Sequence, residues 1–130
     1  MAGYSTNIEQ RTLENEDFRQ VLYTAPHSQL VLMTLQAGED IGAETHPDRD
    51  QFIRVEAGEG EAILDGERHP LGDGSAVVIP AGTEHNVVNT SATAPLRLYT
   101  IYSPPEHPDG TVNRTKQDAI EYERTHHGHG

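Results

Sequence analysis

Turn-forming residues interrupt this sequence at short intervals, and their spacing constrains the fold more than any other feature. Clusters of Gly, Pro, Asp and Asn separate apolar runs that begin about every eight to twelve residues. The runs alternate apolar and polar side chains and are rich in Val, Ile, Leu and Tyr. The pair Asp65–Gly66 between two such runs is a strong signal for a two-residue hairpin. Many short strands joined by tight turns predict an antiparallel β-sandwich or β-barrel.

The individual elements follow from these runs. A chain of 130 residues suits one domain, expected here over residues 1–125, with a disordered histidine-rich tail over 126–130. Residues 1 to 16 carry little pattern and are expected to form an arm or a first edge strand. The segment 115–124 is the only expected helix. Strands are expected at 18–23, 29–36, 51–57, 61–64, 67–71, 76–79 and 96–102.

Composition argues against several classes of protein. The chain has no cysteine, which excludes disulfides, thiolate metal ligands and cysteine nucleophiles. A formal net charge of −12 argues against nucleic acid, whose phosphates need Lys and Arg, and against an anionic membrane surface. No apolar run approaches the roughly 20 residues of a membrane span, and the N-terminal segment lacks the basic and apolar regions of a secretory signal. We therefore expect a cytoplasmic protein that binds neither nucleic acid nor membrane.

Two of the eight histidines lie where an expected strand meets a turn, close to other potential metal ligands. These are His46, which precedes a proline, and His85, which follows a Pro-Ala-Gly turn. Glu44 is two residues before His46, so both side chains point to one face of an extended chain. The chain can turn after His46 and aim Gln51 back at the same face. Two imidazoles and one carboxylate are a donor set that suits a divalent transition metal and leaves open positions.

These residues lie within two motifs that resemble those of a known family. The stretch Gly74–Asn89 has the pattern Gly-x5-Pro-x-Gly-x2-His-x3-Asn and resembles the second cupin motif at every fixed position. The stretch Gly38–Gly58 keeps the spacing of the first cupin motif, but Glu44 replaces its first His and Gln51 replaces its Glu. The runs DQFIRVE, PAGTEHNV and LYTIYSPPEHPDGT also resemble small bacterial cupins. The chain is therefore identified as a single-domain cupin of the bacterial cupin_2 type, a group loosely labelled mannose-6-phosphate-isomerase-like.

The resemblance implies a fold, an oligomer and a cofactor. The fold is all-β, a double-stranded β-helix or jelly-roll barrel with a short C-terminal helix, and the oligomer is a homodimer. The cofactor is one divalent metal ion (Fe, Mn, Ni, Co or Zn) held by Glu44, His46, Gln51 and His85. If Glu44 does not coordinate, it is a candidate catalytic general base, because burial would raise its pKa. The alternative is a cupin without metal, in which these residues form a hydrogen-bonded polar cluster.

Three further residues are candidates for a substrate pocket. Tyr99 and Tyr102 are three residues apart on one expected strand, so they face opposite sides and one of them should line the barrel. His107 lies in the segment PPEHPDG, which could cover the barrel mouth or serve as a rigid tether for the helix. Asp50 competes with Gln51 because the first cupin motif tolerates a shorter gap, but the spacing to Gly58 favours Gln51 and an outward Asp50.

The expected function is that of a metal-dependent enzyme acting on a small oxygenated substrate, of isomerase, lyase or dioxygenase type. A non-catalytic module that holds a small-molecule ligand in the barrel is the alternative, and tight binding without His46 and His85 would favour it. A purely structural or storage barrel is a third interpretation, which the polar residues aimed into the barrel disfavour. A fold shared by many activities does not by itself name the reaction.

Overall fold

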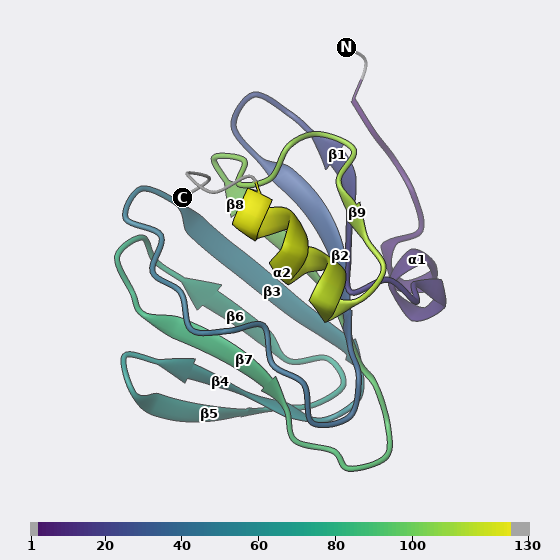
Figure 1. Ribbon diagram of the computed structural model, residues 1–130, viewed down its shortest axis with the longest axis vertical. Helices are drawn as coiled ribbons and strands as arrows, with labels where there is room; N and C mark the ends of the chain where they lie inside the picture. The colour runs from purple at the N-terminus through teal and green to yellow at the C-terminus, as the bar shows by residue number, and fades with distance from the viewer. Residues whose placement is uncertain (1–2, 126–130) are drawn as a thin grey trace.

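The computed structural model describes residues 3–125, which form two antiparallel sheets around one core (Figure 1). The larger sheet contains β1 (Arg19–Thr24), β2 (Gln29–Leu35), β3 (Asp50–Ala57), β6 (Ala76–Ile79), β8 (Leu96–Ser103) and β9 (Val112–Asn113). The smaller sheet contains β4 (Gly60–Leu64), β5 (Glu67–Leu71) and β7 (His85–Asn89). Their strand orders are β6-β3-β8-β2-β1-β9 and β5-β4-β7. The expected all-β architecture of antiparallel strands is confirmed.

Alternating side chains build the core between the sheets. Along β3, Ile53 and Val55 are fully buried, whereas Arg54 between them lies on the outer face. β8 buries Leu96 and Leu98 with the same period of two residues. Because the inward positions of these strands are mostly aliphatic, the two inner faces bury enough apolar surface to hold the sheets together without tryptophan or disulfides.

The hairpin between β4 and β5 forms at Asp65–Gly66, as its sequence predicts. Asp65 has a φ of 48° and Gly66 a φ of 83°, so both residues lie in the left-handed region. A two-residue turn with this geometry matches the right-handed twist of the strands that it joins. It sets the register in which Leu64 pairs with Glu67.

The expectation of an arm or edge strand over residues 1–16 is wrong, because helix α1 (Ile8–Glu14) forms there. Asn7 caps it: its side-chain oxygen accepts a hydrogen bond from the Gln10 backbone N–H at 2.9 Å. Thr12 is fully buried, and its hydroxyl donates to the Ile8 carbonyl at 2.7 Å. The helix packs against β2, β3 and β8, so tertiary packing stabilises a helix too short to form alone.

Helix α2 (Lys116–Thr125) is the helix that the sequence predicts, and it lies across one face of the larger sheet (Figure 1). Its Ala119 is buried, and its Glu123 forms an ion pair with Arg19 of β1. The expected histidine-rich tail, residues 126–130, lies outside the described residues. Neither helix within residues 3–125 has the length and apolar character needed to cross a membrane.

Candidate metal centre

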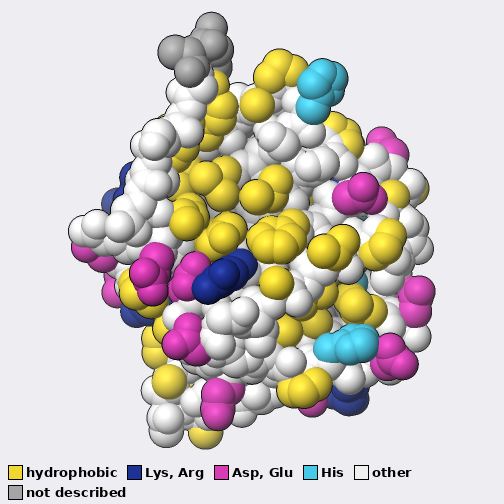
Figure 2. Space-filling view, turned by 180° about the vertical axis from the view of Figure 1, so that it is seen from behind, with side chains coloured by type: hydrophobic (Ala, Val, Ile, Leu, Met, Phe, Trp, Pro, Cys, Tyr) yellow, Lys and Arg dark blue, Asp and Glu magenta, His cyan; other side chains and the backbone are white. Residues whose placement is uncertain are grey.

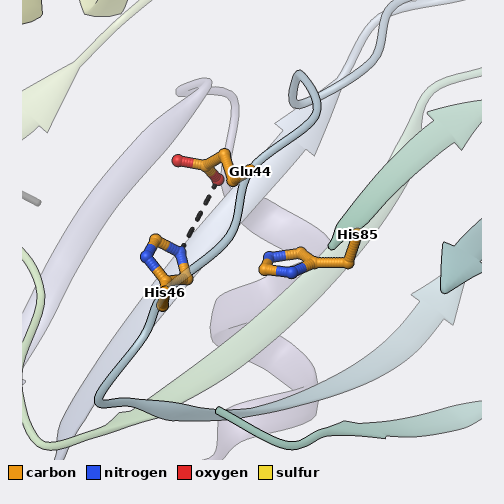
Figure 3. Close-up of side chains that lie close together, drawn as sticks. All are labelled: Glu44, His46 and His85. Atoms are coloured by element: carbon orange, nitrogen blue, oxygen red, sulfur yellow. Dashed lines mark ion pairs between the residues drawn. The ribbon is translucent and has the colours of Figure 1, made fainter. Parts of the chain in front are cut away.

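A short antiparallel bridge brings Glu44 and His85 together. The Glu44 N–H donates to the His85 carbonyl at 2.9 Å, and the His85 N–H donates to the Glu44 carbonyl at 2.8 Å. Residues paired in this way across an antiparallel bridge project their side chains from the same face. The carboxylate from the first cupin-like motif therefore lies beside the imidazole from the second, as Figure 3 shows.

The turn of the second motif also holds the segment that carries His46. The Gly82 N–H donates to the His46 carbonyl at 2.8 Å, and the Ala81 N–H donates to Asp50 Oδ1 at 2.9 Å. Gly82 has a φ of 87°, a conformation that a side chain would strain. This turn therefore needs its glycine in order to fix the backbone position of His46.

Glu44, His46 and His85 each offer one ligand atom, and these atoms lie within 4.8 Å of one another. Glu44 Oε1 is 3.8 Å from His46 Nε2 (Figure 3). His85 Nδ1 lies 2.9 Å from the Thr83 carbonyl, which can only accept, so this hydrogen bond requires the proton on Nδ1. In the neutral imidazole, this tautomer has its lone pair on His85 Nε2, an atom that is buried and has no hydrogen-bond partner among the described residues. This is how protein histidines are prepared for a metal ion.

Gln51 provides a fourth potential donor from the inner face of β3. It is buried, and its side-chain amide donates to Thr100 Oγ1 at 3.0 Å. The amide orientation leaves Gln51 Oε1 buried without a hydrogen-bond partner in the described part of the chain. Asp50 is exposed, so the strand alternation aims it outward, as expected. A buried acceptor and buried imidazole nitrogens without partners are costly unless a cation satisfies them, so these residues fit a divalent metal ion.

Residues 31–102, which include both motifs and the clustered side chains, match the model of the Cupin_2 family, described as a cupin domain. This chain belongs to the cupin family. Fold and motif spacing agree with that membership, and Glu44 and Gln51 stand where the first cupin motif has His and Glu.

Relatives share most of this cupin's length. The uncharacterized protein YrkC of Bacillus subtilis is 49% identical over 90% of this chain. The matched region covers only 66% of the length of YrkC. The crystal structure of BH2720 from Bacillus halodurans is 47% identical, with a TM-score of 0.88 over 91% of this chain and 93% of that chain. The structure of KdgF from a Halomonas species is 26% identical, with a TM-score of 0.62 over 70% of this chain and 79% of that chain.

Glu106 lies beside His46 on the side away from Glu44, and the sequence analysis did not select it. Its Oε1 is 3.7 Å from His46 Nδ1 and 3.0 Å from Arg49 Nε, and its side chain is 5% exposed. Gln29 holds the loop, because its Oε1 accepts from the Glu106 and His107 N–H groups at 3.1 and 3.0 Å. The segment PPEHPDG therefore lies against the barrel interior. In the sequence, the only sign of a role for Glu106 is that a charged residue stands next to the candidate His107 in this segment.

Burial shifts the protonation of these groups. It raises the pKa of Glu44 to about 7, although the positive charge of Arg19 opposes the shift. It also raises the pKa of Glu106 to about 7 and lowers the pKa of His46 to about 4. The Glu44 side chain is 33% exposed and that of Glu106 is 5% exposed. Water therefore screens the charge of the Glu44 carboxylate more than that of Glu106. At neutral pH, therefore, His46 is an uncharged imidazole, and both carboxyl groups are partly protonated without a cation.

The three expected pocket residues separate into two groups. Tyr102 is buried with its ring 6.0 Å from that of His46, and the His107 ring is 5.2 Å from Tyr102. Tyr99 lies on the outer face of β8 instead, with its ring 6.3 Å from Phe52. The sequence left open which of the two tyrosines lines the barrel; the phase of β8 buries Tyr102, so Tyr99 is no longer a pocket candidate. Burial also raises the pKa of Tyr102, which stays a neutral phenol.

Proposed function

We propose that this cupin binds one divalent metal ion through Glu44, His46, Gln51 and His85 and acts as an enzyme on a small oxygenated substrate. The arrangement of His85 carries the proposal. Its ring orientation is set by the Thr83 carbonyl, and its buried Nε2 faces a cluster of further donors. Two imidazoles, one carboxylate and one amide oxygen suit Fe, Mn, Ni, Co or Zn.

The side chains around the ion have distinct tasks. A bound ion of this kind supplies Lewis-acid chemistry, or redox chemistry if it is iron, to an isomerase, lyase or dioxygenase reaction. Glu44 is the most exposed of the cluster, and if it does not coordinate the ion it is the candidate to hold or move a proton. Glu106, whose Oε1 faces His46 Nδ1 at 3.7 Å, is the candidate to tune the basicity of the His46 ring, and Tyr102 is the candidate to offer a neutral hydroxyl to a substrate oxygen. His107, whose ring lies 5.2 Å from that of Tyr102, is the further candidate to line the substrate pocket.

Metal analysis tests this function. The chain without residues 126–130 is reconstituted separately with each of the five metals, and at least one of them should bind at one ion per chain. The double variant His46→Ala, His85→Ala should not bind that metal. His69→Ala is the matched control, because His69 is 44% exposed and pairs with Glu67 at 3.0 Å. A folded barrel without stoichiometric metal would contradict the proposal and favour the polar cluster. Tight small-molecule binding by the His46→Ala, His85→Ala variant would favour the non-catalytic module.

We also propose that the protein works as a cytoplasmic homodimer. The outer face of the larger sheet supports the dimer, because hydrophobic side chains gather across it (Figure 2). One cross-strand row runs through five strands of this face. It consists of Val78, Phe52, Ile101, Leu30 and Tyr23, which are successive partners in the sheet register. A second copy would remove this apolar row from water.

A further inference from the structure

A second group of polar side chains lies between the proposed metal ligands and helix α2. Glu106 connects this group to the metal ligands, because its Oε1 is 3.7 Å from His46 Nδ1. His107 makes a second connection through its ring contact with Tyr102 at 5.2 Å. The group surrounds a small pocket whose lining includes Arg19, Glu106, His107, Asn113, Tyr122 and Glu123.

Arg19 lines this pocket from the inner face of β1 and is only 4% exposed. Its Nη1 is 3.4 Å from Asn113 Oδ1 and 3.4 Å from Glu123 Oε2, which are long hydrogen bonds. Its Nε is buried and has no hydrogen-bond partner within residues 3–125. A buried guanidinium is costly unless it is well paired, and its planar fork matches a carboxylate through two parallel hydrogen bonds. Arg19 therefore has binding capacity that its present contacts do not use.

We propose that this pocket binds a carboxylate group of the substrate and that Arg19 is the residue that holds it. The inference rests on the proposed metal-dependent function: the reacting end of the substrate lies at the metal ligands and its carboxylate lies at Arg19. Glu123 now supplies a carboxylate to the guanidinium through one long contact. Its side chain is 54% exposed, so it can leave the guanidinium for solvent when a substrate carboxylate arrives.

The charges around Arg19 favour a carboxylate over other groups. Glu44 and Glu106 are both within the electrostatic influence of Arg19, which lowers the pKa of each against the effect of burial. A monovalent carboxylate that displaces Glu123 exchanges one negative charge for another. A phosphate dianion would add a charge beside Glu106, and a neutral hydroxyl would leave the buried guanidinium without a counter-ion. The pocket therefore selects a carboxylic acid within the wider class of small oxygenated substrates.

Titration with three small probes tests this inference. Propionate, inorganic phosphate and 1-propanol are titrated into the full chain, both metal-loaded and metal-stripped, and binding is followed by NMR chemical shifts. Propionate should bind, and Arg19→Gln should weaken its binding by on the order of tenfold or more, since a charged hydrogen-bond pair is lost. Glu123→Gln should strengthen it several-fold because the competing carboxylate is removed. Arg68→Gln is the control, because Arg68 is 66% exposed on β5 and should change nothing.

Each other result overturns the proposal. Propionate binding that is absent, or that Arg19→Gln leaves unchanged, removes the role of Arg19, and tighter binding of phosphate removes the carboxylate assignment. If Arg19→Gln does not fold, the exposed Glu123→Gln variant decides, because unchanged propionate affinity there also contradicts the proposal. Metal uptake by the same samples separates the two hypotheses. Arg19-dependent propionate binding by a chain that takes up no metal on reconstitution would contradict the metal-dependent enzyme and leave the role of Arg19 intact.

Discussion

In the proposed metal site, a proton and the metal ion would compete for the carboxylate of Glu44. Its pKa is raised to about 7, so below that pH an ion must displace a proton, whereas His46, with a pKa lowered to about 4, is already neutral. We expect metal affinity to rise by up to about tenfold per pH unit as pH increases toward 7, and to level off above it. Competition with a chelator of known affinity between about pH 5.5 and pH 8.5 measures this dependence.

The control for this dependence is the isosteric variant Glu44→Gln. It removes the titrating ligand, so affinity should fall at pH 8 and its slope with pH should decrease. The remaining slope belongs to Glu106, whose pKa is also raised to about 7 and whose ionised form a nearby cation favours. An unchanged slope in Glu44→Gln would show that Glu44 is not the group that metal binding deprotonates.

In the proposed site, Glu106 would influence the metal through His46, because its Oε1 lies 3.7 Å from His46 Nδ1. We expect Glu106→Gln to weaken metal affinity by about tenfold or more, because partners of ligating histidines set ring orientation and basicity. Glu67→Gln is the control, since Glu67 is 77% exposed and pairs with His69 on the outer hairpin. Isothermal titration with the bound metal measures both variants. If Glu106→Gln and the parent chain bind the metal with equal affinity, Glu106 does not influence the metal, and its role is limited to the ion pair with Arg49.

At the scale of elements, the approach of β4 to β7 depends on Gly60. A Cβ added there would lie 2.5 Å from the Val88 carbonyl oxygen and 2.9 Å from Leu96 Cδ2. We expect Gly60→Ala to lower the free energy of unfolding by about 1 to 3 kcal/mol, because backbone must move to make room. Gly72→Ala should change it by less than about 0.5 kcal/mol, because nothing lies within 4 Å of its added Cβ. Urea unfolding of the two variants gives the comparison, and equal losses would contradict it.

Local signals were sufficient for much of the fold and for part of the site. The hairpin at Asp65–Gly66 depends on two adjacent residues, and both adopt the left-handed conformation that this pair favours. The turn at Gly82 and the position of His85 follow from a motif sixteen residues long. Alternation along β3 separates an inward Gln51 from an outward Asp50. In each case the deciding interactions lie within one turn or one strand.

The parts that the sequence did not predict depend on distant contacts. Glu106 reaches His46 because Gln29, 77 residues earlier in the chain, binds its backbone. α1 owes its stability to packing on the larger sheet, and only the cap at Asn7 marks it in the sequence. Both faces of β8 are half apolar, so alternation could not decide whether Tyr99 or Tyr102 is buried. The pairing of β8 with β2 and β3 determines that Tyr102 faces inward, and this pairing cannot be read from the sequence of β8 alone.

At the scale of the whole molecule, the apolar row on the outer face determines the expected oligomer. Val78 is 67% exposed at one end of the row, on edge strand β6. In a dimer formed through this face, Val78→Asp buries an unpaired carboxylate and should weaken the dimer by about tenfold or more. Val112→Asp is the matched control, because Val112 is 51% exposed on the opposite edge strand, β9, outside the row.

Light scattering across a dilution series separates these outcomes. A chain of 14.3 kDa should elute as a species of twice that mass, and Val78→Asp should move the midpoint of dissociation to higher protein concentration. Because Arg19, His46, Gln51 and His85 are buried whereas both valines are exposed, the proposed metal content should stay unchanged in both valine variants. If the parent chain is monomeric at all concentrations, the proposed homodimer is wrong. A dimer that responds equally to both variants would instead place the contact elsewhere on the barrel.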